Sequence, residues 1–146
     1  MIDKQFIGKV IADFRTIAPA SQLRFFAKAT GETRAIYLDE AAARDAGHPG
    51  LPLPPTFLFS LELGAPPSGW RDEIGIKIER ILHGEQSFNY HRMAYAGDTL
   101  HFKTHIADIY DKKGGALEFV VRETRVTNQD GEHVADLRSV LVHRNG

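Results

Sequence analysis

The sequence has no cysteine among its 146 residues. It therefore excludes a thiol nucleophile, a cysteine-ligated zinc or iron–sulfur centre and a thiol redox motif, because each of these requires the sulfur atom. The absence of cysteine also favours a cytoplasmic location, since disulfides belong mainly to oxidising compartments.

An excess of charge of one sign is also missing. Lys and Arg total 18 and Asp and Glu total 19, which gives a formal net charge of −1. Without an overall basic field to attract phosphates, we expect no nucleic-acid partner.

Long apolar runs are absent as well. The longest weakly polar stretch, residues 50–61, is interrupted by Pro52, Pro54 and Pro55. It falls short of the roughly 20 residues that cross a bilayer. Residues 1–8 lack the charged leader and apolar core of a signal peptide. We therefore expect no membrane partner.

The remaining composition is that of an ordinary soluble domain, with 42% hydrophobic and 25% charged residues. A chain of this length buries roughly 68% of its unfolded surface, so it needs no metal or disulfide to fold. We expect one domain, over residues 1–146.

Helical patterns occupy the first half of the chain. The spacing of apolar residues predicts helices over residues 19–30 and 39–46, which end at Gly31 and Gly47. Residues 56–63 are apolar almost all round, which is typical of a helix buried against a sheet.

Alternating patterns dominate the second half. They predict four long antiparallel strands, over residues about 76–91, 99–109, 116–127 and 134–143. A first strand is expected within residues 9–14, which gives five in all. The predicted fold class is α+β, with a long antiparallel sheet wrapped around one apolar helix, which is the hot-dog arrangement.

Three stretches of this pattern resemble a known family. The string Leu82–Arg92, the following Ala96–Leu100 and the earlier Leu53–Phe57 resemble the N-terminal half of MaoC-type acyl-thioester dehydratases. The resemblance implies (R)-specific hydration or dehydration of enoyl and 3-hydroxyacyl thioesters of coenzyme A or acyl carrier protein. It also implies dimers or fused double hot-dogs as the working assembly, with no cofactor.

The catalytic motif of that family, Gly-Asp-x-Asn-Pro-aliphatic-His, is altered in this sequence. The matching stretch begins at Gly31 and has Glu32 for aspartate, Arg34 for asparagine, Ala35 for proline and Tyr37 for histidine. A phenol is a poor base at neutral pH. The standard dyad is therefore absent, which resembles the non-catalytic subunits of heterodimeric dehydratases.

Two other pairs offer an acid and a histidine. His48 and Glu62 lie 14 residues apart, which resembles the spacing in acyl-carrier-protein dehydratases. The alternative is that Glu62 is exposed at the last helical turn and His48 is a loop residue. Strict alternation places His83 and Glu85 on one strand face, where they flank a substrate or form a polar face at a dimer seam. Gly84 between them indicates a bulge or a close backbone approach.

The start of the apolar helix, Pro55-Thr56-Phe57, presents N–H groups that can hold a thioester oxygen. Together with Tyr37 and Gly84, these are the predicted substrate-binding residues. We expect no metal site, because His101 and His105 on one strand lie roughly 13 Å apart.

Three functions follow from these observations. The first is a hydratase or dehydratase with a nonstandard catalytic set drawn from Glu32, His48, Glu62 and His83. The second is a non-catalytic acyl-binding subunit that works with a chain carrying the intact motif. The third is a hot-dog thioesterase, since fold does not determine function. Each binds acyl-CoA or acyl-carrier-protein thioesters, and an exposed sheet edge predicts at least a homodimer or a heterodimer.

Overall fold

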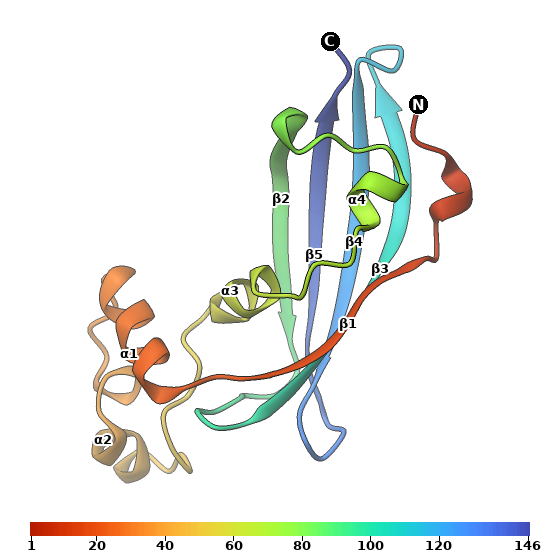
Figure 1. The fold of residues 1–146 in the computed structure, drawn as a ribbon. Helices are drawn as coiled ribbons and strands as arrows, with labels where there is room; N and C mark the ends of the chain where they lie inside the picture. The colour runs from red at the N-terminus through yellow and green to blue at the C-terminus, as the bar shows by residue number, and fades with distance from the viewer.

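A computed structural model describes residues 1–146 and shows a five-stranded antiparallel sheet (Figure 1). The strands lie in the order β1-β3-β4-β5-β2, so β1 and β2 form the two edges. Their bounds are β1 Val10–Ile17, β2 Ile81–Tyr90, β3 Thr99–Lys112, β4 Leu117–Thr127 and β5 His133–Arg144. The predicted α+β hot-dog class with five antiparallel strands is confirmed.

The helices are short and lie mainly before the long strands. Their bounds are α1 Ala20–Ala29, α2 Glu40–Asp45, α3 Phe57–Leu63 and α4 Trp70–Glu73, with 3-10 turns η1 Lys4–Phe6, η2 Ala35–Tyr37 and η3 Ile78–Arg80. The three predicted helices are confirmed. Helix α4 was not predicted, and residues 76–80 are not strand, so the predicted start of β2 was too early.

Local sequence signals explain two of these helices. Asp39 caps α2 by accepting a hydrogen bond from the N–H of Ala42 at 2.7 Å. Gly31 follows α1 with a φ of 75°, which lies in the left-handed region where glycine carries no penalty. No helix combines the length and apolar character that crossing a membrane requires.

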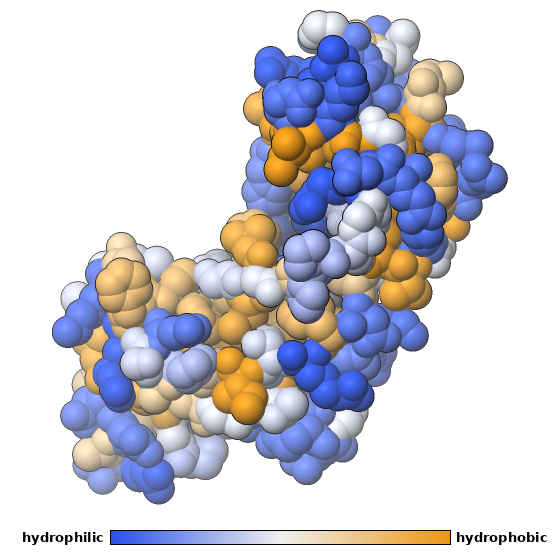
Figure 2. All heavy atoms as spheres, in the orientation of Figure 1, coloured by the Kyte–Doolittle hydropathy of each residue, from blue (hydrophilic) through white to orange (hydrophobic).

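The core has two parts along the inner face of the sheet. The first joins α1 and α3 to the sheet around Leu23, Phe57 and Phe102. The second lies towards the other end of the strands, around Trp70 and Ile106. Figure 2 shows the surface of the molecule as two lobes with a narrower region between them.

Helix α3 is much shorter than the sheet that it packs against. Its 7 residues span about 10 Å at 1.5 Å per residue, whereas the 14 residues of β3 span about 46 Å. The rest of the inner face is crossed by segment 64–80, which contains α4 and η3 (Figure 1). This mismatch in length leaves space beside α3.

The first and last segments meet at one end of the sheet (Figure 1). Buried Glu118 on β4 accepts hydrogen bonds from the N–H of Ile2 and, at 2.6 Å, from the side-chain amide of Asn145. Burial acts to raise the pKa of Glu118, but these hydrogen bonds and the N-terminal charge hold it below its ordinary value.

Candidate functional site

Two hollows flank helix α3. The smaller has a volume of about 390 Å³ and lies between η2, the proline segment, the start of α3 and the end of β2. We call it the Tyr37 pocket. The larger has a volume of about 920 Å³ and lies between the end of α3, segment 64–80 and the inner face of the sheet. We call it the Glu62 cavity.

The Tyr37 pocket has a mainly apolar lining with a few polar groups. Tyr37, Pro55, Leu58 and Tyr90 all line it. Tyr37 itself is buried, and the guanidinium carbon of Arg34 lies 4.8 Å from the centre of its ring. The pocket therefore contains two of the predicted substrate-binding residues, Tyr37 and Pro55.

The N–H groups of Thr56 and Phe57, at the start of α3, are bonded within the chain. Thr56 has a φ of 72°, and its N–H donates to the hydroxyl of Tyr90 at 2.9 Å. The N–H of Phe57 donates to the carbonyl of Pro54 at 3.1 Å. The side chain of Phe57 is buried in the core, with its ring 5.1 Å from that of Phe26. Thioester binding by Thr56 and Phe57 stays a prediction, and it requires these hydrogen bonds to open.

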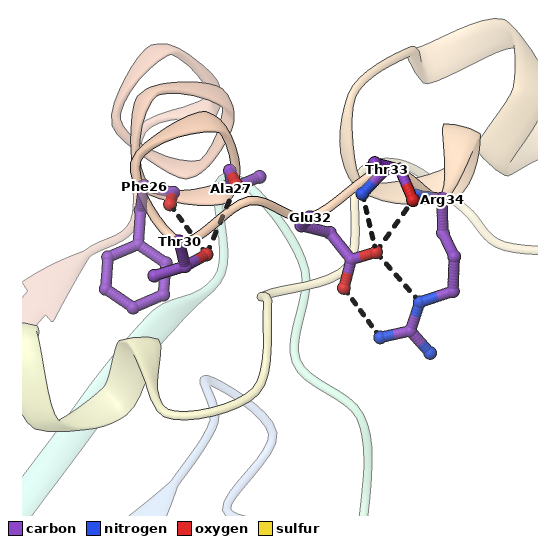
Figure 3. A network of polar contacts seen from close by, with 6 residues as sticks. All are labelled: Phe26, Ala27, Thr30, Glu32, Thr33 and Arg34. Atoms are coloured by element: carbon purple, nitrogen blue, oxygen red, sulfur yellow. Dashed lines mark hydrogen bonds and ion pairs between the residues drawn. The ribbon is translucent and has the colours of Figure 1, made fainter.

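Glu32, at the family's aspartate position, is held by its neighbours (Figure 3). Its Oε1 accepts from the backbone N–H groups of Thr33 and Arg34 and from Arg34 Nε at 3.0 Å, and its Oε2 accepts from Arg34 Nη2 at 2.6 Å. The Arg34 hydrogen bonds lower the pKa of Glu32 to about 2. A carboxylate so stabilised is a weak base.

His48 lies away from both hollows. Its Nδ1 is 3.2 Å from the hydroxyl of Tyr95, and the two rings are 5.8 Å apart. Glu62, which the sequence paired with it, lines the Glu62 cavity instead. The structure thus does not bring His48 and Glu62 together within one chain.

Glu62 is the last of three buried polar side chains that are linked by hydrogen bonds. Its Oε1 accepts a hydrogen bond from the hydroxyl of Thr124, which lies 2.8 Å from the hydroxyl of Thr104. Only 8% of Glu62 is exposed, and its Oε2 has no partner. The alternative that Glu62 is exposed at the end of the helix is therefore wrong.

Arg122 on β4 brings a positive charge to the same cavity. Its Nε is buried without a hydrogen-bond partner. Burial lowers the pKa of its guanidinium, while the negative charge of Glu62 acts in the opposite direction. Sequence reasoning missed Arg122, although its alternation with Val120 and Thr124 on one face of a strand was a usable signal.

His83 also lines the Glu62 cavity, with its ring stacked on Phe59 of α3 at 5.3 Å. The structure separates it from Glu85, because a bulge at Gly84 shifts the register. His83 pairs with Leu141 and Glu85 with the adjacent Val140, so the two side chains lie on opposite faces. The bulge at Gly84 is confirmed; the shared face of His83 and Glu85 was wrong.

The predicted catalytic residues therefore divide among three places. Glu62 and His83 share the Glu62 cavity, Glu32 lies beside Arg34 near the Tyr37 pocket, and His48 lies against Tyr95. No common centre unites all four within one chain.

Comparison with known proteins gives a family match over most of the chain. Residues 5–137 match the family described as FAS1-like, dehydratase domain region. A UPF0336 protein from Saccharopolyspora erythraea is 32% identical over 145 residues, covering 98% of this chain and 92% of the relative. A second, UPF0336 protein SCO4636 from Streptomyces coelicolor, is 36% identical over 148 residues, covering 98% and 95%.

Solved structures give the same fold. The truncated HadBC complex, a 3R-hydroxyacyl-ACP dehydratase from Mycobacterium tuberculosis, contains a chain 26% identical with a TM-score of 0.75, covering 90% of this chain and 96% of that one. A chain of the ChsH1-ChsH2 complex from the same organism matches with a TM-score of 0.73 at 22% identity, covering 97% and 89%.

Proposed function

Because this chain belongs to the FAS1-like dehydratase-region family, we propose that it is the acyl-binding subunit of a heteromeric dehydratase. Its ligands are 3-hydroxyacyl and enoyl thioesters of coenzyme A or acyl carrier protein, as in fatty-acid metabolism. The catalytic acid and base come from a second hot-dog chain with the intact Gly-Asp-x-Asn-Pro-x-His motif.

The altered motif between α1 and η2 is the observation that carries the proposal. Removing water from a 3-hydroxyacyl thioester needs a base for the α-proton and an acid for the departing hydroxyl. Here the carboxylate of Glu32 is hydrogen-bonded to Arg34, and buried Tyr37 stands where the family has histidine. This chain can shape a substrate pocket at that position but has no acid–base pair there.

The Tyr37 pocket supports acyl binding. Its volume of about 390 Å³ falls within the range of small-molecule pockets. Leu58 and Met93 supply apolar surface for an acyl chain, and Tyr90 and Arg92 supply polar groups at its side. A subunit can thus contribute affinity and chain-length selection without performing the chemistry.

The edge strand β2 supports assembly with a second chain. It has a neighbour on one side only, and an unpaired edge presents free N–H and C=O groups to another strand. Apolar side chains on or beside this strand are exposed, including Leu82 at 49%, Tyr90 at 49% and Ile78 at 75%. We propose that the partner's sheet continues this one along β2. HadBC, a complex of two kinds of chain, is the relevant precedent.

The test is loss of enoyl absorbance with trans-2-enoyl coenzyme A, using this chain alone and mixed with a motif-carrying hot-dog chain of the same genome. We expect turnover only in the mixture, together with a heteromer on size-exclusion chromatography. Leu82→Lys should abolish both, whereas Lys113→Ala, in the exposed β3–β4 turn, should preserve them. Full turnover by this chain alone would overturn the proposal.

A second candidate rests on the Glu62 cavity. Glu62 and His83 line one hollow, and the free Oε2 of Glu62 has no competing partner. This pair is the chain's own alternative acid and base for hydration. Turnover by the isolated chain that disappears in both Glu62→Gln and His83→Gln would select this function, and release of free coenzyme A would select a thioesterase.

A further inference from the structure

Three metal-ligating side chains converge where β2 ends beside β5. His91 follows β2, and His133 and Asp136 belong to β5. Their ligand atoms all lie within 4.8 Å of one another. This cluster takes no part in the hydrogen bonding around Glu32 or in the Glu62 cavity, although His91 also borders the Tyr37 pocket.

The two histidines point their Nε2 atoms at one carboxylate. His91 Nε2 lies 2.8 Å from Asp136 Oδ2, and His133 Nε2 lies 2.8 Å from Asp136 Oδ1. Ligands of a tetrahedral zinc ion with bonds of about 2.0–2.1 Å stand about 3.3 Å apart. Admitting an ion between them therefore requires small rotations of these partly exposed side chains.

The sheet holds the three residues in place. The N–H of His91 donates to the carbonyl of Val134 at 2.9 Å. Asp136 is paired with Asn89 across the β2–β5 ladder. His133 and Asp136 thus lie on a paired strand, where ligands are positioned more rigidly than on a loop.

The charge around the cluster suits a cation. Asp136 accepts hydrogen bonds from both imidazoles, so a carboxylate charge lies between them. The imidazole rings lie only 4.2 Å apart, a distance at which two imidazolium charges would repel each other. The neighbouring cation, Arg92, is paired with Glu132 at 3.1 Å.

We propose that His91, His133 and Asp136 form a binding site for a divalent transition-metal ion, with Zn²⁺ as the preferred occupant. Two imidazoles and one carboxylate form a donor set that suits zinc and does not suit magnesium or calcium, which prefer oxygen ligands. Three protein ligands leave a fourth position for water. The ion joins the end of β2 to β5 at the border of the Tyr37 pocket, and this role does not depend on the proposed function.

The test is metal titration of the full chain without a histidine tag. Zn²⁺ is titrated against a chromophoric chelator, and Co²⁺ is used separately because its visible absorption reports coordination. We expect one ion per chain and a rise in Tm on adding Zn²⁺ but not Mg²⁺. His133→Ala and Asp136→Asn should each weaken binding by at least about tenfold, since even outer-shell partners of a ligand contribute that much.

His101→Ala is the matched control. His101 Nε2 lies 2.5 Å from Asp13, but this pair is not part of any three-ligand group. The control should bind Zn²⁺ as the unchanged chain does. Asp136→Asn keeps the shape of its side chain, so a folded protein is expected, and circular dichroism verifies this. Absence of binding, or binding that His133→Ala and Asp136→Asn leave unchanged, would overturn the proposal.

Discussion

Gly84 and Val142 approach so closely across the β2–β5 pair that a β-carbon on residue 84 would lie 2.9 Å from Val142 Cγ2. The same β-carbon would lie 3.1 Å from the carbonyl oxygen of Val140. The backbone oxygen cannot move without distorting the ladder. Glycine at this position is therefore a requirement of the bulge that separates His83 from Glu85.

We expect Gly84→Ala to destabilise the fold by about 1–3 kcal/mol, as overpacking does. Ser87→Ala, an exposed position on the same strand, should change stability much less. Urea denaturation of both variants measures the difference. Equal stability of the two variants would show that β5 moves aside without cost.

The pairing of Glu32 with Arg34 predicts an unusual titration. Glu32 should titrate near pH 2 instead of near its ordinary value of 4.5. A depressed carboxyl pKa stabilises the fold above the ordinary value, and this contribution is lost as the pH falls towards 2. NMR of the Glu32 carboxyl should show its pKa rising in Arg34→Gln. Arg44→Gln, which breaks the separate Glu40–Arg44 pair, should leave it unchanged.

Thr124 supplies the only hydrogen bond to the side-chain carboxylate of buried Glu62. Thr124→Val removes this donor and leaves the carboxylate unsatisfied, so we expect a loss of about 1–3 kcal/mol. Thr127→Val, half-buried on the same strand without a side-chain hydrogen bond, is the control. Thermal unfolding distinguishes the two, and a stable Thr124→Val would mean that solvent replaces the donor.

Thr56 has a left-handed backbone that β-branched residues rarely adopt. Thr56→Gly should therefore stabilise the fold by about 1 kcal/mol through relief of this strain. The greater conformational entropy that glycine gives the unfolded chain reduces this gain. Thr33→Gly, where φ is not positive, should give no gain. Chemical denaturation measures both, and destabilisation in Thr56→Gly would show that the threonine side chain contributes more than its backbone strain costs.

Local signals were sufficient for much of the fold. The apolar run at residues 56–63 predicted α3, and alternation predicted the long strands β3, β4 and β5. The pattern failed at residues 76–80, because Ile76 and Ile78 alternate like strand residues while belonging to the crossing segment, in which Ile78 begins the 3-10 turn η3. Ile76 is buried against the second core, so its apolar character reflects tertiary packing.

The candidate site was less predictable because its residues meet through strand pairing. Alternation assigned His83 and Glu85 to one face, and only the register across β5 reveals the bulge. The His91, His133 and Asp136 cluster was missed for the same reason. Spacing within one strand cannot reveal it, because the cluster joins the residue after β2 to two residues of β5.

The bulge in β2 also limits what can add to the edge of the sheet. A regular, exposed edge accepts almost any extended chain, which promotes aggregation. A bulge increases the local twist and bends its strand, so a straight foreign strand can follow β2 on only one side of Gly84. A single glycine thus disfavours uncontrolled polymerisation along β2, and the proposed partner would need a matching irregularity in its own edge.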